Sequence, residues 1–173
     1  EASDTSELIS QVLYGDHFKV LEHRKSWSRI RLGCDKYEGW IDNKQFQFIE
    51  ELEYKALHKS EPLMAMDLVD FITTQKQHLH PILLGSTLNG LSYLEHTFEG
   101  TARVGQNDKS KLVETALLYL NTPYLWGGKT PFGIDCSGFV QMVYKLNGFS
   151  ILRDASQQAS QGDALSFIEE SEP

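Results

Sequence analysis

The sequence lacks the features that would place the chain in a membrane or in a disulfide-rich framework. It has only two cysteines, Cys34 and Cys136, and without a repeated cysteine framework they indicate one packed and one reactive thiol in preference to a disulfide. No apolar run approaches the roughly 20 residues that cross a bilayer, and the opening EASDTSEL has no basic region followed by an apolar one. We expect a soluble chain whose signal peptide was removed or never existed.

Positive charge is also scarce. The chain has 16 Lys+Arg against 24 Asp+Glu, and the basic residues are scattered along it, which argues against nucleic acid as a partner. Hydrophobic residues make up 40% of the 173 residues, enough for one core and a smaller module. We expect one or two compact units.

The first part of the chain has the pattern of short strands. HFKVLEH, WSRIRLG and EGWIDN contain β-branched and aromatic residues in partial alternation, and CDKYEG between the last two is typical of a hairpin turn. This predicts a small β-barrel over residues 1–50. EELEYKALHK then predicts a helix that ends before Pro62, within a linker of residues 51–67.

Residues 68–106 return to strand-like pieces, VDFIT, HPILLGS, GLSYLEHTFEG and TARVG, separated by glycine and by Asn89-Gly90. They predict a second, smaller barrel. His78 and His80 alternate here without a nearby cysteine or carboxylate pattern, which is typical of the surface of a strand. We therefore predict no metal site and no cofactor.

From residue 107 the pattern becomes helical, and residues 107–173 form a third unit. NDKSKLVETALLYLN predicts a helix with Asp108 and Ser110 as candidate N-caps. Its apolar face consists of Leu112, Val113, Ala116, Leu117 and Leu120. A second helix starts near Asp135 and stops at Gly148. Its apolar stripe consists of Cys136, Phe139, Val140, Val143 and Tyr144.

Cys136 occupies a position that suits a nucleophile. A thiol with a pKa of about 8.5 is mostly protonated at neutral pH, and the thiolate is the reactive form. The unpaired N–H groups and positive dipole end of a helix's first turn favour that anion, and the Cys136 N–H would point at the oxygen of an attacked carbonyl. A cysteine on the apolar stripe of a helix is also commonly a packing residue, and its position alone leaves that alternative open.

The strings PYLWGG, GIDCSGFV and ILRDASQQ together resemble the NlpC-type cell-wall cysteine peptidases, a papain-like bacterial family. The resemblance covers about Tyr119 to Gly162. The matching residues are Pro123, Tyr124, Trp126, Gly127, Gly128, Asp135, Cys136, Ser137, Gly138 and Phe139. The preceding parts are similar to one branch, the gamma-D-glutamyl-L-diamino-acid endopeptidases, in which two bacterial SH3-like barrels precede the catalytic domain. The implied fold class is α+β: two small SH3-like β-barrels followed by an incomplete papain-like domain.

The resemblance implies roles for individual residues. Cys136 would be the nucleophile, and the Tyr124 hydroxyl would complete the oxyanion hole. The substrate-binding residues would be Asp135, facing the free amine of L-alanine, and Ser137, Ser156, Arg153, Glu38 and Tyr37. Simpler structural roles stay open: a core position for Tyr124, a capping or surface ion pair for Arg153, and a solvated turn position for Glu38.

The sequence departs from the family in its histidines. The family's general base is a histidine well downstream of the cysteine, whereas all six histidines here precede Cys136; they are His17, His23, His58, His78, His80 and His96. The resemblance also implies a sheet that bears this base, and the sequence stops where that sheet would begin, which leaves the apolar faces of the two helices uncovered. We interpret the chain as an incomplete segment of a longer protein, through truncation, internal cleavage or chain splitting, and expect the missing strands to come from a second polypeptide. A degenerate binder that does not cut, or an upstream histidine acting as base, are the alternatives.

We therefore predict a cysteine peptidase that hydrolyses the bond between gamma-D-glutamate and the diamino acid in peptidoglycan peptides with free N-terminal L-alanine. The predicted partners are that peptide and the missing C-terminal part of the catalytic domain, with no nucleic acid and no metal. The rival interpretation is a noncatalytic peptidoglycan-binding module, and an acyltransferase or amidase is disfavoured. The bacterial cell envelope, periplasmic or secreted, is preferred over the cytoplasm. Diaminopimelate and lysine stay equally open.

Overall fold

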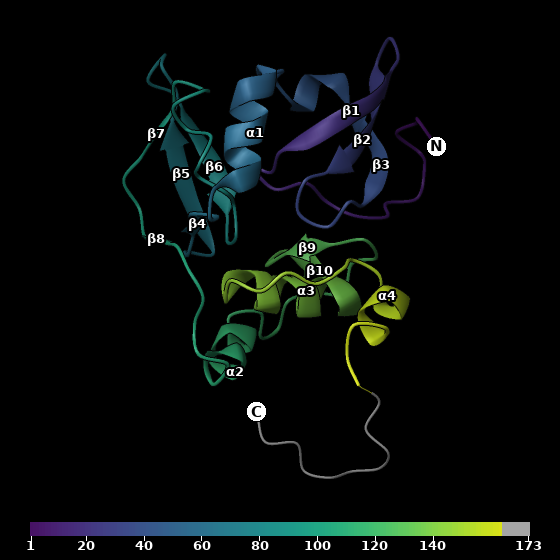
Figure 1. Cartoon of the computed structure of the whole chain (residues 1–173), viewed down its shortest axis with the longest axis vertical. Coiled ribbons are helices and arrows are strands. Elements are labelled where there is room, and N and C mark those ends of the chain that lie inside the picture. The colour runs from purple at the N-terminus through teal and green to yellow at the C-terminus, as the bar shows by residue number, and fades with distance from the viewer. Residues whose placement is uncertain (164–173) are drawn as a thin grey trace.

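The N-terminal part is a three-stranded antiparallel sheet that follows the predicted pattern. The computed structural model describes residues 1–163, and its first strands are β1 (Phe18–His23), β2 (Trp27–Leu32) and β3 (Glu38–Asp42), in the order β1-β2-β3 (Figure 1). Burial alternates along β2, with Ile30 and Leu32 inside. The predicted turn joins β2 to β3, and Lys36 within it adopts φ 64°.

A short 3-10 helix, η1 (Asn43–Gln45), and the helix α1 (Glu51–Lys59) follow this sheet. α1 ends before Pro62, as the sequence predicts, and Glu50 and Glu53 form a capping box at its start. None of its residues is buried. Packing therefore contributes little to this helix, and its cap and an exposed pair between Lys55 and Glu51 support it.

The middle part contains the strands β4 (Met64–Ala65), β5 (Val69–Thr73), β6 (Leu79–Leu83), β7 (Thr97–Phe98) and β8 (Ala102–Arg103). β5 lies between β6 and β7, and β4 pairs with β8. The small core of this part consists of Ala65, Ile72, Ile82 and Leu88. β4 falls within residues 51–67, which the sequence suggested as a linker. An SH3-like barrel over this part stays a prediction.

The third part contains α2 (Lys111–Leu117), the hairpin of β9 (Lys129–Thr130) and β10 (Gly133–Ile134), α3 (Cys136–Leu146) and α4 (Ala155–Ala159). α3 begins directly after Asp135, as predicted, and Gly148 with φ 80° follows its end. In Figure 1, β9 and β10 lie between α3 and the N-terminal sheet, and side chains of α3 reach past this hairpin to Asp16 and Asp35.

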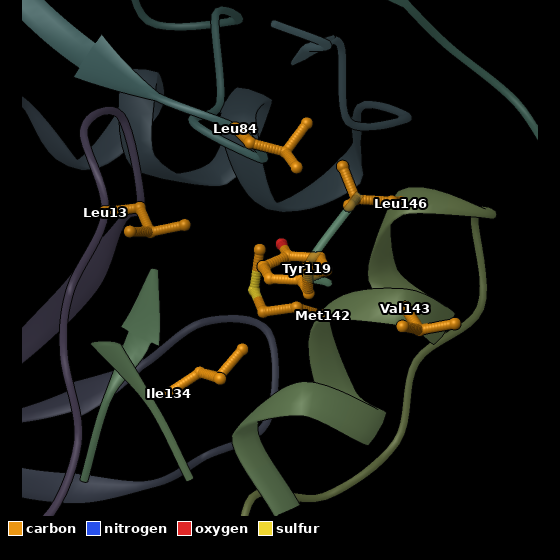
Figure 2. Close-up of a cluster of buried hydrophobic side chains, with 7 residues drawn as sticks. All are labelled: Leu13, Leu84, Tyr119, Ile134, Met142, Val143 and Leu146. Atoms are coloured by element: carbon orange, nitrogen blue, oxygen red, sulfur yellow. The ribbon is translucent and has the colours of Figure 1, made fainter. Parts of the chain in front are cut away.

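One hydrophobic core joins parts that the sequence suggested were separate units. Its members are Leu13, Leu84, Tyr119, Ile134, Met142, Val143 and Leu146 (Figure 2). They come from the N-terminal segment, the residue after β6, the stretch after α2, strand β10 and helix α3. Because the three parts share these buried side chains, their positions relative to one another are fixed by packing.

The predicted apolar faces of α2 and α3 are incompletely covered within residues 1–163. Val113, Leu117 and Leu120 are exposed on and just after α2, although Thr115 and Tyr119 are buried. Cys136 and Val140 are exposed on α3. Large apolar side chains of both helices are therefore exposed among the residues that the structure describes.

Candidate active site

Cys136 is the first residue of α3, and its side chain is exposed. Asp135 follows β10 directly and has an extended backbone. Its carboxylate Oδ1 accepts a hydrogen bond from the Gly138 N–H at 2.6 Å. Among residues 1–163 no hydrogen bond involves the Cys136 N–H or Sγ. The first turn therefore presents a thiol and an unpaired N–H group together, the pair that attack on a carbonyl requires.

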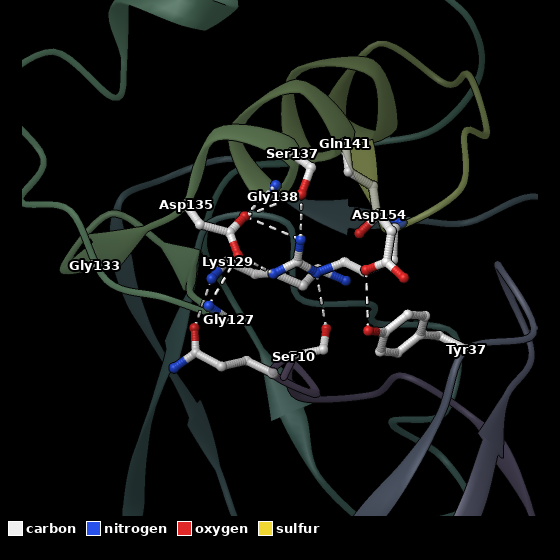
Figure 3. A network of polar contacts seen from close by, with 12 residues as sticks. Ser10, Tyr37, Gly127, Lys129, Gly133, Asp135, Ser137, Gly138, Gln141 and Asp154 are labelled. Carbon is white, nitrogen blue, oxygen red and sulfur yellow. Dashed lines mark hydrogen bonds and ion pairs between the residues drawn. The ribbon is translucent and has the colours of Figure 1, made fainter. Parts of the chain in front are cut away.

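Asp135 is the centre of a buried polar network at this helix start (Figure 3). The Arg153 guanidinium donates to both carboxylate oxygens, Nη1 to Oδ1 at 3.0 Å and Nη2 to Oδ2 at 2.7 Å. Nη1 also donates to Ser137 Oγ at 2.9 Å, and Nε donates to Ser10 Oγ at 3.1 Å. Arg153 is only 1% exposed. The predicted residues Asp135, Ser137 and Arg153 are thus brought together and bind one another.

The network determines the charge of Asp135. Burial alone would raise the pKa of this carboxyl. The hydrogen bonds from Arg153, Gly138 and Gly127, together with the positive charge of Arg153, outweigh burial and hold the pKa below its ordinary value. Asp135 is therefore ionised at neutral pH.

The loop of PYLWGG lies against the start of α3. Gly127 has φ 77°, a conformation that favours glycine, and its N–H donates to Asp135 Oδ2 at 2.8 Å. Tyr124 forms a parallel bridge with Ile134, two residues before Cys136, and its side chain is 67% exposed. The loop backbone is thus fixed beside the cysteine, and the oxyanion role of the Tyr124 hydroxyl stays a prediction.

Of the other predicted substrate residues, Tyr37 contacts the third part of the chain, Ser156 lies on α4, and Glu38 lies on the surface of the N-terminal sheet. The Tyr37 hydroxyl donates to Asp154 Oδ1 at 3.0 Å, and Asp154 is the N-cap of α4, on which Ser156 is exposed. Burial, with this hydrogen bond, raises the pKa of Tyr37 to about 12. Glu38 binds Arg29 and Arg31 at the surface of the sheet, and these arginines hold its pKa below the ordinary value.

Two residues of the site were missed by sequence reasoning. Ser10 anchors Arg153, and Gln158 donates from Nε2 to the Ser137 carbonyl at 2.9 Å. Ser10 lies outside every motif of the sequence, since a hydrogen bond between distant segments leaves no local pattern, whereas Gln158 is the last residue of ILRDASQQ and could have been found there.

Four of the six histidines have side-chain polar partners, and none of these partners is Cys136. The Tyr14 hydroxyl lies 2.8 Å from His96 Nδ1, His17 Nε2 lies 3.3 Å from His58 Nδ1, and His23 Nδ1 lies 2.8 Å from the Ser28 hydroxyl. Within residues 1–163 no cluster of histidine, cysteine or carboxylate side chains has an arrangement suited to a metal ion. In the same range no helix is both long and apolar enough to span a membrane.

Comparison with known proteins identifies both ends of the chain. Residues 1–46 match the bacterial dipeptidyl-peptidase Sh3 domain, and residues 121–173 match the NlpC/P60 family. The N-terminal segment thus matches a bacterial SH3 domain, and the C-terminal segment, which includes Cys136, matches the NlpC/P60 family. The SH3 match covers the first of the two predicted barrels.

Several curated proteins and one solved structure are similar to most of this chain. Dipeptidyl-peptidase 6 of Lysinibacillus sphaericus is 29% identical over 87% of this chain and 66% of the relative. The gamma-D-glutamyl-L-lysine dipeptidyl-peptidase of Bacillus subtilis is 28% identical over 90% of this chain and 59% of the relative. A solved NlpC/P60 family protein from Bacillus cereus has the same fold, with a TM-score of 0.71 at 22% identity over 91% of this chain and 61% of that one. The chain spans about three-fifths of the length of these proteins.

Proposed function

We propose that this chain provides the nucleophile of a cysteine peptidase that hydrolyses the bond between gamma-D-glutamate and the diamino acid of wall peptides with free N-terminal L-alanine. The observation that supports it most is Cys136, exposed in the first turn of α3, with an N–H that has no hydrogen-bond partner among residues 1–163, in a segment that matches the NlpC/P60 family. The names of the relatives support gamma-D-glutamyl peptides as substrates.

In the proposed reaction the Cys136 thiolate attacks the gamma-carbonyl carbon, and a carbon–sulfur bond forms. The oxygen becomes an oxyanion, which the Cys136 N–H and the Tyr124 hydroxyl would stabilise. Collapse of this intermediate breaks the carbon–nitrogen bond, and the leaving amine takes up a proton. Water then attacks the thioester, which releases the carboxylate and regenerates the thiol.

The reaction needs an imidazole to move these protons, and we propose that a further segment of the catalytic domain supplies it. Supporting this, Cys136 Sγ has no hydrogen-bonded histidine among residues 1–163, and large apolar side chains are exposed on the third part of the chain. They are Val113, Leu117, Leu118, Leu120, Tyr124, Leu125, Trp126, Phe132 and Val140. A segment that contains the base and packs on these side chains would complete both the core and the site.

A noncatalytic peptidoglycan-binding module is the second candidate, since the described residues contain no base at Cys136. We also propose the cell envelope as the location, where such peptides occur.

The proposal is tested by incubating the full-length protein with L-Ala-gamma-D-Glu-diaminopimelate and with L-Ala-gamma-D-Glu-L-Lys. We expect release of the diamino acid, its loss in Cys136→Ala, and its retention in Cys34→Ala, which changes the other thiol. Binding of the peptides without cleavage would instead support the second candidate.

A further inference from the structure

The N-cap of α3 contains an electrostatic conflict. A carboxylate is a good helix cap because it accepts a hydrogen bond from a first-turn N–H, as Asp135 does from Gly138. The same negative charge lies one residue from Cys136. A nearby like charge opposes formation of a thiolate, and it offsets the positive end of the helix dipole.

Arg153 has the geometry to remove this conflict. Its guanidinium contacts both Asp135 oxygens, at 3.0 and 2.7 Å, and is almost completely buried, where opposite charges interact strongly. Its third contact, with Ser137 Oγ at 2.9 Å, places the positive charge on the first turn of α3. Its Nε is fixed to Ser10 Oγ at 3.1 Å, so the N-terminal segment sets the position of the guanidinium.

We propose that Arg153 is a positioning residue whose buried charge cancels that of Asp135, so that the carboxylate caps α3 without suppressing the reactivity of Cys136. This assignment differs from a substrate contact, because the donors are directed at groups of the protein. Other ionisable groups at this end of the fold are Asp154, which accepts from Tyr37, and Tyr124 of the adjacent loop. The proposal rests on Cys136 being the nucleophile.

The test is the rate at which iodoacetamide alkylates Cys136 in the full-length protein between pH 5 and pH 10, followed by mass spectrometry of the peptide that contains it. We expect Arg153→Gln to slow alkylation at pH 7 by about tenfold, the change produced by a shift of one pH unit in a thiol's titration, while the rate at high pH is unchanged. Arg153→Lys, which retains the charge, should lose only part of the rate. Arg24→Gln, the same change at an exposed pair with Glu22, should leave the profile unaltered.

A second variant distinguishes charge cancellation from a structural role. Asp135→Asn removes the negative charge and leaves Arg153, so it should move the half-maximal rate to lower pH. The double variant Arg153→Gln, Asp135→Asn should return to within about threefold of the natural protein, because both charges are absent. If Arg153→Gln does not fold, the pH profile of Cys136 alkylation in Asp135→Asn alone tests the proposal.

The proposal is overturned if Arg153→Gln slows alkylation equally at every pH, if the double variant is as slow as the single one, or if Asp135→Asn leaves the profile unmoved or shifts it to higher pH. Alkylation measures the thiol and not turnover. A protein with the expected profiles that cleaves no wall peptide would refute the proposed function and leave the role of Arg153 intact.

Discussion

The two sides of α3 differ sharply. The side that faces the N-terminal part is buried and bonded: Gln141 Nε2 donates to Asp35 Oδ2 at 2.9 Å, and Lys145 lies 3.0 Å from Asp16. The other side exposes Cys136. The contacts of the buried side, which we call the held side, fix the orientation of α3. They therefore determine where the opposite side, which we call the free side, presents the Cys136 thiol.

The held side is unusual in being rich in charge. Burial would raise the pKa of Asp16, but the charges of Lys145 and Lys129 outweigh it and hold that pKa below its ordinary value. Burial would lower the pKa of Lys145, but Asp16 raises it above the ordinary range. Removal of the N-terminal part would leave these lysines without their acidic partner. The N-terminal part is therefore a structural part of the fold that holds α3 in place.

The largest effect on stability is expected when the held side loses one charge. Asp16→Ala should lower the free energy of unfolding by about 3–5 kcal/mol, because Lys145 stays buried without a partner. Asp16→Leu combined with Lys145→Met should recover most of the loss, since no unpaired charge remains. Chemical denaturation of the three proteins measures this. A double variant as unstable as Asp16→Ala would show that the pair itself is favourable.

The next largest effect on stability is expected from shortening apolar side chains of α3, and it should differ between the held side and the free side. Met142→Ala removes a fully buried side chain and should cost about 2–5 kcal/mol. Val140→Ala should cost less than about 1 kcal/mol in the 173-residue chain and clearly more in the full-length protein, if a further segment covers that side. The test is the denaturant midpoint of each variant, measured in the 173-residue chain and in the full-length protein. Equal costs for Val140→Ala in the two would contradict the proposed covering segment.

The buried carboxylates around α3 should also make the free energy of unfolding depend on pH in the acidic range. The folded pKa values of Asp16 and Asp135 are lowered, so their contribution is complete above the unfolded value of about 4 and is lost as the pH falls through the folded values. We expect the free energy of unfolding to decline below about pH 4, and Asp16→Asn to decline less steeply. Chemical denaturation at pH 7, 5, 4 and 3 measures the free energy of unfolding of both proteins. An equally steep decline in the natural protein and in Asp16→Asn would show that Asp16 does not contribute to the acid dependence.

The smallest effect is expected away from α3. Lys55→Ala breaks an exposed pair with Glu51 on α1 and should leave the thermal midpoint unchanged within error. A clear loss of stability here would mean that surface pairs, and not the buried ones on α3, account for the charge dependence.

Local signals in the sequence predicted much of this fold. Alternation in WSRIRLG gave β2, and Asp135 and Gly148 marked the two ends of α3, because caps and turns depend on neighbouring residues. The contacts of Ser10 with Arg153 and of Asp16 with Lys145 could not be predicted in this way. Each joins segments far apart in sequence, so it depends on how the parts pack.

The central claim is that Cys136, on the free side of α3, forms the covalent intermediate. The most direct measurement is mass spectrometry of the full-length protein quenched with acid shortly after mixing with L-Ala-gamma-D-Glu-L-Lys. We predict an L-Ala-gamma-D-Glu acyl group on the peptide that contains Cys136, none on Cys34, and none in Cys136→Ala. Cleavage that continues undiminished in Cys136→Ala, without an adduct on Cys136, would contradict the account.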